Sequence, residues 1–150
     1  METIHYGKKV NILSKKVKWG FDIVSEKHGV TGVQARVLNF IVREGNNNQV
    51  FQKKIEEEFR LRRSTVTGIV QLMEERELIT REISKEDARA KKIKLTKKGI
   101  ELQKIINLEI EEYESLLVKG IDRDKLKIFS EVISDIYKNI DSVYGEGDLC

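Results

Sequence analysis

The sequence contains no proline and only one cysteine, Cys150, which stands at the last position. A single cysteine excludes an intramolecular disulfide and fits a reducing cytosol. Proline ends or kinks helices, and the glycines here fall mostly between periodic segments, so the composition favours a largely helical chain with few sharp breaks. At 150 residues the chain is expected to form one domain, residues 1–150, that is long enough to bury a core.

Long apolar runs are also missing. Residues 1–16 (METIHYGKKVNILSKK) lack the apolar segment of a signal peptide, and no run approaches the ~18 apolar residues that a membrane span requires. We therefore expect a soluble, cytoplasmic protein without a membrane partner.

Signals for catalysis and metal binding are equally scarce. Neither His5 nor His28 lies in a cluster with metal-ligand spacing, and Cys150 lies in a polar tail where a nucleophile would lack a formed pocket. The sequence contains no glycine-rich motif of the GxxxxGK[ST] or GxGxxG type for phosphates or dinucleotides. We therefore predict that the protein is not an enzyme, and we assign no cofactor, catalytic residue or metal site.

The charge is nearly balanced but unevenly distributed. The chain has 28 basic and 25 acidic residues, a net charge of +3 with histidine neutral. Residues 52–98 hold 14 basic and 9 acidic residues, or +5, which leaves 14 basic and 16 acidic residues, or −2, elsewhere. A basic excess confined to one segment is the distribution expected of a nucleic-acid-binding surface.

That segment contains Arg60–Glu77 (RLRRSTVTGIVQLMEERE), which has the spacing of an amphipathic helix. Its apolar residues recur at i, i+3, i+4 and i+7. They are Val66, Ile69, Val70 and Met73. The opposite side is small and neutral, which is unusual in a chain this rich in lysine and glutamate. It consists of Ser64, Gly68 and Gln71, with Thr67 at its edge.

A small, neutral helix face preceded by arginines suits insertion into the major groove of DNA. The groove admits one helix, serine, threonine and glutamine can read base edges there, and arginine can take phosphate or guanine. An ordinary amphipathic helix with a short polar side fits the spacing equally well, so the spacing alone does not decide between the two interpretations.

Two short segments with strand-like alternation follow the helix. Leu78–Ile83 (LITREI) and Lys91–Thr96 (KKIKLT) flank the polar segment Ser84–Ala90 (SKEDARA). Upstream, Val50–Phe51 is predicted to add a strand, and Gln52–Phe59 to form the first helix of a helix-turn-helix. The order helix, strand, charged loop, strand is that of a winged helix-turn-helix.

Residues 30–99 resemble the multiple-antibiotic-resistance regulator (MarR) family of bacterial transcription factors. The likeness is carried by VTGVQARVL, by RRSTVTGIVQLMEERELITRE and by DARAKKIKLTKKG across the wing. Its most specific parts are the wing pair Asp87 and Arg89 and the closing residues Leu95, Thr96 and Gly99. The resemblance implies that Arg89 reaches into the minor groove and that Asp87 orients it.

The candidate DNA contacts fall into three groups. The major-groove candidates are Arg62, Arg63, Ser64, Thr65, Thr67, Gly68 and Gln71. The wing candidates are Asp87 and Arg89, and the phosphate candidates are Arg60, Lys91 and Lys92, with Arg62 and Arg63 able to serve there as well. Gln71 is best suited to a bidentate contact with adenine. A mid-helix glycine at Gly68 costs about 1 kcal/mol, which close approach to DNA or to another helix would offset.

Both ends of the chain are predicted to be helical. Helices are expected from Thr3 to His28, from a cap at Thr31 to Gly45, from a cap at Thr96 to about Lys119, and from Asp122 or Asp124 onward. The last helix has a heptad stripe, which requires a partner helix. The residues predicted to form a dimer contact are Val10, Leu13, Val17, Leu126, Phe129, Ile133, Ile136, Ile140 and Val143.

We therefore expect a mainly α fold with a small antiparallel β wing, in which residues 31–99 form the winged helix-turn-helix lobe. Residues 1–30 and 100–150 are expected to form a helical dimerisation lobe, as the resemblance also implies. A homodimer would place two reading helices in successive major grooves of a palindromic site. A monomeric bundle that uses every stripe internally is the alternative.

The predicted function is sequence-specific binding of double-stranded DNA by a homodimeric transcriptional regulator that acts as a repressor. The resemblance implies relief by a small aromatic or anionic effector. Trp19, Phe21 and Tyr113 lie on helices that such a site would use, but large aromatics at helical spacing are more often core residues, so no ligand site is assigned. The alternative function is a helical protein–protein adaptor without affinity for DNA.

Overall fold

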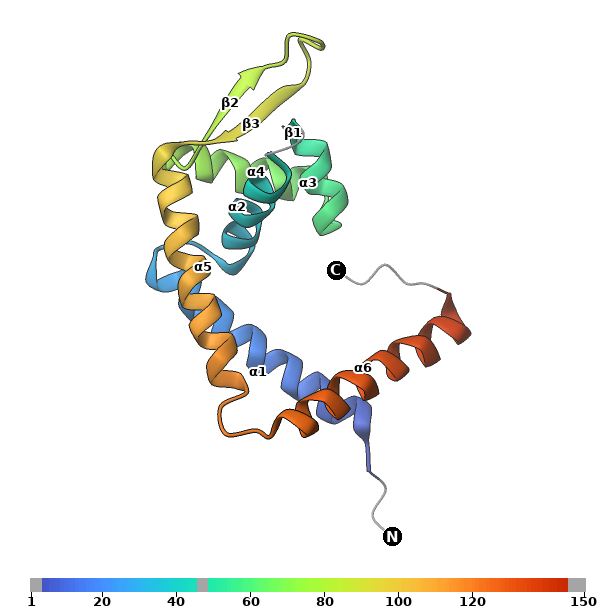
Figure 1. Cartoon of the computed structure of the whole chain (residues 1–150). Helices are drawn as coiled ribbons and strands as arrows, with labels where there is room; N and C mark the ends of the chain where they lie inside the picture. The colour runs from blue at the N-terminus through green and yellow to red at the C-terminus, as the bar shows by residue number, and fades with distance from the viewer. Residues whose placement is uncertain (1–3, 46–48, 146–150) are drawn as a thin grey trace. The chain divides into compact units, whose positions relative to one another are not determined.

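The computed structural model describes residues 4–45 and 49–145 (Figure 1). Thr3, where the first helix was predicted to begin, and Cys150 lie outside the described residues. The elements in order are α1 (Tyr6–Lys27), α2 (Gly32–Gly45), β1 (Val50–Phe51), α3 (Gln52–Phe59), α4 (Arg63–Glu75), β2 (Ile79–Ile83), β3 (Lys91–Leu95), α5 (Lys97–Leu117) and α6 (Arg123–Tyr144). The chain forms two compact units, residues 1–113 and 114–150.

The first unit is built around a core supplied by α2, α3, α4 and the small sheet. The helix α2 contributes the buried Val37, Leu38 and Ile41, while Val33 and Val42 are half-buried. The buried hydrophobic residues outside α2 are Val30, Val50, Ile55, Val66, Val70, Met73, Leu78, Ile79, Ile93 and Ile106. The core therefore lies directly beneath the helix-turn-helix and fixes its geometry.

The sheet has the strand order β1-β3-β2, and both strand pairs are antiparallel. Ile79 lies opposite Leu95 and Ile83 opposite Lys91, so β2 and β3 form a hairpin that projects from the helices (Figure 1). The two-residue strand β1 pairs with β3 through Val50 and Ile93. The predicted wing and its additional strand are both confirmed.

Side-chain caps begin three of the helices at the predicted residues. The hydroxyl of Thr31 accepts from the Gln34 amide at 3.2 Å, and the hydroxyl of Thr96 accepts from the Gly99 amide at 3.0 Å. The carboxylate of Asp122 accepts from the Asp124 amide at 2.9 Å. These bonds satisfy amide groups that have no partner within their own helix.

Gly99 occupies a position that no larger residue can take. A Cβ atom there would lie 2.1 Å from the carbonyl oxygen of Leu78 and 3.1 Å from its carbonyl carbon. The Thr96 amide also donates to that oxygen at 3.1 Å, and the Thr96 hydroxyl donates to the carbonyl of Glu77 at 2.6 Å. The closing residues of the wing thus join the end of β3 to the chain that leaves α4.

The long helices leave much apolar surface uncovered. On α5, Ile106 is buried, whereas Ile105 and Leu116 are 48% and 61% exposed. The helix α6 has no buried residue. Among the described residues, no helix combines the length and the apolar character needed to cross a membrane.

Candidate nucleic-acid interface

The helix α4 is anchored through the stripe that its sequence predicted. Val66, Val70 and Met73 are fully buried, and Ile69 is half-buried against the same core. The predicted outward residues Ser64, Thr65, Thr67, Gly68 and Gln71 are all exposed. The helix therefore presents a small, neutral surface on a rigid support.

Gly68 has open space on its outer side. A Cβ atom added there would meet nothing within 4 Å, so the described chain supplies no helix contact that would explain this glycine. Of the two explanations for a mid-helix glycine at this position, close approach to an external surface is the one that the geometry leaves open.

The turn before α4 gathers positive charge at the amino end of the helix. Arg60 takes the left-handed conformation with φ of 49° and ends α3, and Arg62 is the N-cap residue of α4. Arg62 and Arg63 are exposed, and the first turn of α4 contains no acidic residue. A helix amino terminus carries a partial positive charge, so this end of α4 favours anions such as phosphate.

Gln52 contributes to the face of α4 from the start of α3, and sequence reasoning missed it. Its amide Nε2 donates to Oγ1 of Thr67 at 2.8 Å, while the Thr67 hydroxyl donates to the carbonyl of Arg63 at 2.8 Å. The contact depends on how α3 crosses α4, and the polar residue at the start of α3 was the only signal in the sequence.

Gln71 already has a partner within its own helix. Its Nε2 donates to Oε1 of Glu75 at 3.0 Å, one turn further along α4. Both residues are exposed, so the bond is open to exchange with another acceptor. A bidentate contact to a base would require Gln71 to leave Glu75.

The tip of the wing is shaped by side chains that bind its own backbone. The hydroxyl of the buried Ser84 accepts from the amides of Glu86 and Asp87 at 3.2 and 3.4 Å. Asp87 Oδ1 accepts from the backbone amide of Arg89 at 2.9 Å, and the Ser84 amide donates to the carbonyl of Ala90 at 2.9 Å. Asp87 therefore orients Arg89 through the main chain, and the Arg89 side chain remains exposed.

The phosphate candidates on the wing lie along β3. Lys91 is exposed and faces Ile83 across the hairpin, and Lys92 is half-buried opposite Glu82. Lys94, which was not among the candidates, forms an ion pair with Glu82 at 3.1 Å. Of these lysines, Lys91 is the most open to an external phosphate.

The far end of α4 is tied to the corner between α1 and α2. The Arg76 guanidinium donates to the carbonyl of Gly29, and Lys98 donates to the Arg76 carbonyl at 2.9 Å. At the same corner, Glu109 of α5 binds Lys27 at 3.0 Å and His28 at 2.9 Å. The hydrogen bond from Lys27, followed by the one from His28, lowers the pKa of the Glu109 carboxyl.

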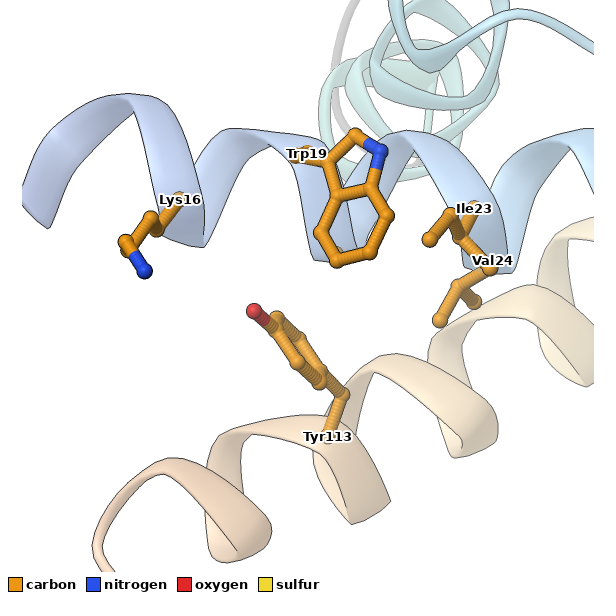
Figure 2. A pocket seen from close by; sticks show the side chains of 6 residues that line it. Lys16, Trp19, Ile23, Val24 and Tyr113 are labelled. Atoms are coloured by element: carbon orange, nitrogen blue, oxygen red, sulfur yellow. The ribbon is translucent and has the colours of Figure 1, made fainter.

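An open hollow of about 450 Å³ lies between α1 and α5, lined by Lys16, Trp19, Gly20, Ile23, Val24 and Tyr113 (Figure 2). Trp19 is 68% exposed, so it is not the core residue that helical spacing most often indicates. Tyr113 packs edge-on against Phe21 with ring centroids 5.1 Å apart, and its hydroxyl donates to the Val17 carbonyl at 3.3 Å. Figure 2 shows the rings of Trp19 and Tyr113 on facing helices, with Lys16 at one end of the hollow and Ile23 and Val24 at the other.

The close approach of Tyr113 to α1 depends on Gly20. A Cβ atom on Gly20 would lie 2.1 Å from the Cζ and Oη atoms of Tyr113.

Within residues 4–45 and 49–145, no group of three His, Cys, Asp or Glu side chains could hold a metal ion.

Comparison with known proteins places this geometry in context. Residues 28–90 match the sequence model of the MarR family. The transcription regulator MarR of Oenococcus oeni PSU-1 is 29% identical, with a TM-score of 0.66 over 89% of this chain and 99% of that one. MepR, a transcription regulator of the Staphylococcus aureus multidrug efflux pump MepA, is 20% identical, with a TM-score of 0.81 over 91% of this chain and 99% of that one.

Two further structures contain a bound partner. The complex of S. aureus MepR with DNA has a TM-score of 0.77 at 21% identity, over 92% of this chain and 99% of that one. PcaV of Streptomyces coelicolor in complex with its natural ligand has a TM-score of 0.67 at 19% identity, over 91% and 96%. The winged-helix fold predicted from the sequence is therefore found in solved structures that align over nearly the whole chain.

Proposed function

We propose that the protein is a sequence-specific, double-stranded-DNA-binding transcriptional regulator of the MarR family, whose sequence model matches residues 28–90. The observation that carries the proposal is the outward face of α4. It is small, neutral and exposed, it follows an arginine-rich turn, and its helix is fixed by three fully buried residues. A face of this kind fits the major groove, where side-chain hydroxyls and amides can contact base edges.

The wing supplies the second contact in this proposal. Arg89 is exposed at the tip of the hairpin, and Asp87 holds its backbone in place. An arginine held in this way suits a narrow A·T-rich minor groove, where the negative potential is enhanced. Arg60, Lys91 and Lys92 would contact phosphates and add affinity that depends on salt rather than on sequence.

The protein would act as a homodimer on a palindromic operator. Two reading helices related by a two-fold axis must be about 34–36 Å apart to enter successive major grooves. The stripes of α1 and α6 provide the proposed contact, because Val10, Leu13, Phe129, Ile140 and Val143 are each between 42% and 70% exposed in the single chain. On this proposal residues 31–99 read the DNA, and residues 1–30 and 100–150 hold the two subunits together.

Binding near a promoter would exclude polymerase, so we propose repression as the direction of control. The hollow between α1 and α5 is the site that we assign to an effector. Trp19 and Tyr113 would flank an aromatic ring, and the ammonium group of Lys16 would pair with an anionic group. A small aromatic acid therefore fits its chemistry.

The proposal is tested by selecting a randomised duplex library with the purified protein at two salt concentrations. An inverted repeat with half-sites one helical turn apart, whose affinity falls steeply with salt, is the expected result. The variant Arg89→Ala should then weaken operator binding strongly while leaving the dimer intact. Absence of both enrichment and salt-sensitive binding would favour a helical protein–protein adaptor instead.

A further inference from the structure

Thr67 lies on the exposed face of α4, and its hydroxyl group is already hydrogen-bonded within the protein. The hydroxyl donates to the carbonyl of Arg63 at 2.8 Å, and the same oxygen accepts from Nε2 of Gln52 at 2.8 Å. A threonine hydroxyl has one donor hydrogen and two acceptor lone pairs. Thr67 therefore retains one lone pair and its γ-methyl group for contact with a molecule that docks on α4.

The orientation of the Gln52 amide is fixed by the acceptors around it. Besides Thr67, its Nε2 lies 3.1 Å from Oε1 of Glu56 and 3.5 Å from the carbonyl oxygen of Arg63. A carboxylate and a carbonyl accept hydrogen bonds but cannot donate them, so the amide must turn its NH₂ group toward this cluster. Gln52 is consequently a donor to Thr67, and the hydrogen of Thr67 is directed to Arg63.

This donor also selects one conformation of Thr67. In a helix, threonine divides between two χ1 rotamers, because its hydroxyl can reach a carbonyl of the preceding turn. The amide of Gln52 approaches from α3 alone, so it favours the rotamer that places Oγ1 at 2.8 Å. The substituents of Cβ rotate together, and the methyl group is therefore held in one direction as well.

We propose that Gln52 is a positioning residue for base recognition, which holds Thr67 so that this side chain selects A·T pairs. The inference rests on the proposed function, with α4 in the major groove. An A·T pair offers the N6 amino donor of adenine to the free lone pair, and the C5 methyl group of thymine to the γ-methyl. A G·C pair also has an amino donor, N4 of cytosine, but it has no methyl group, and the N7 and O6 acceptors of guanine find no free hydrogen on Thr67. The methyl contact therefore decides the preference.

Uracil substitution tests the methyl contact directly. In the operator duplex recovered by selection, each thymine is replaced in turn by uracil, which removes only the C5 methyl group. Binding of the full-length protein is measured by fluorescence anisotropy. We expect one thymine in each half-site whose replacement weakens binding about fourfold, the value of one buried methyl-sized group.

Two variants of Thr67 separate the methyl group from the hydroxyl. We call the factor by which this thymine-to-uracil replacement weakens binding the uracil penalty. Thr67→Ser keeps the hydroxyl and loses the methyl, so the uracil penalty should disappear. Thr67→Val keeps a methyl group in this place, and the penalty should remain. An equal uracil penalty in the wild type and in Thr67→Ser would overturn the inference.

The role of Gln52 is tested with Gln52→Met, which has a similar length and no donor. Thr67 is then free to change rotamer, and the uracil penalty should fall toward onefold. In the double variant Gln52→Met/Thr67→Val the penalty should return to about fourfold, because valine in a helix keeps one strongly preferred rotamer. A purely structural role for Gln52 would not be rescued in this way, so a penalty that stays lost in the double variant would overturn the inference.

Gln103→Met provides the matched control. Gln103 is also a half-buried helix glutamine, and its Nε2 donates to Asn39 Oδ1 at 3.1 Å on another part of the unit. This variant should keep the wild-type penalty. If Gln52→Met keeps it too, Gln52 does not position Thr67, although operator binding persists. Failure to recover any operator would instead overturn the proposed function itself.

Discussion

The helices α4 and α6 carry apolar stripes of similar regularity, and the structure treats them in opposite ways. On α4, the exposed fraction of Val66, Val70 and Met73 is 0%, because α2, α3 and the sheet supply the opposing surface. On α6 no residue is buried, and Phe129 and Val143 remain 51% and 70% exposed. The periodic spacing of apolar residues thus identifies which face of a helix packs against another surface, but it does not identify the partner that supplies this surface.

The two helices also differ in what they leave for other molecules. The buried residues of the α4 stripe pack in the core, and the small polar face of the helix stays exposed. A heptad stripe such as that of α6 is stabilised when another helix packs on it. We therefore expect α4 to recognise a partner through its polar face and α6 to associate through its apolar face, and four substitutions test this difference between the two helices.

Met73→Ala should have the largest effect, because it opens a cavity beneath α4. We expect the free energy of unfolding to fall by about 2–5 kcal/mol, measured by urea denaturation at a fixed protein concentration. Leu72→Ala is the control, since Leu72 is the adjacent residue and is 52% exposed. Its loss should stay below about 1 kcal/mol, and equal losses would show that burial does not distinguish the two sides of α4.

Phe129→Asp tests the opposite case on α6. A charge in the proposed contact should raise the dimer dissociation constant by about a hundredfold or more, as measured by sedimentation velocity over a concentration series. Ser134→Asp is the charge-matched control, because helical spacing places Ser134 away from the stripe. An unchanged dimer dissociation constant for Phe129→Asp would show that this face of α6 is not part of the dimer contact.

Gly20→Ala extends the comparison to α1, where one glycine is covered and another is open. A methyl group at Gly20 would meet the Tyr113 ring at 2.1 Å, so we expect a loss of about 1–3 kcal/mol and a lower Tm. Gly7→Ala in the same helix meets nothing within 4 Å and should gain up to about 1 kcal/mol from helix propensity. A higher Tm in both variants would contradict the close packing of Tyr113.

Glu109→Gln should have the smallest effect, and its effect should depend on pH. The pKa of the Glu109 carboxyl is held below its ordinary value of 4.5 by the hydrogen bond from Lys27 and then by that from His28. A depressed carboxyl pKa stabilises the folded chain above the unfolded pKa, and this contribution disappears as the pH falls through the folded pKa. The Tm difference between wild type and variant should therefore be present at neutral pH and vanish in acid.

A matched measurement on a surface ion pair provides the control for that pH dependence. Asp135 pairs with Lys138 at 3.3 Å, and both side chains are more than 70% exposed. Asp135→Asn should change the Tm less than Glu109→Gln at neutral pH, because exposed pairs contribute little. A difference for Glu109→Gln that is independent of pH would show that its carboxylate is not what stabilises the corner.

The sequence predicted the features that depend on neighbouring residues. The caps at Thr31, Thr96 and Asp122 follow from short-range side-chain to backbone bonds, and the buried side of α4 follows from its period. The strands of the wing were also predicted within a residue of their observed ends. In each case the structural feature is fixed by residues a few positions apart.

Contacts between distant segments could not be predicted in this way. Tyr113 and Val17 are 96 positions apart, and Gln52 reaches Thr67 across the turn between two helices. Such contacts depend on the angle and distance at which helices cross, which the ridges of both surfaces set together. The helical spacing of apolar residues identified Thr67 as an outward residue, whereas the fold determined which of its atoms remain available for contact with another molecule.

The junction at Gly99 separates the tip of the wing from the rest of the fold, so the tip can change without altering the base of the hairpin. The Leu78 carbonyl accepts from the Thr96 amide and lies against Gly99, so both ends of the hairpin meet at a single peptide group. A tip of different length or charge between Ile83 and Lys91 would leave the path from α4 to α5 unchanged. A change in the loop between the two strands would therefore alter the tip of the wing, while the junction keeps the base of the hairpin attached to α4 and α5.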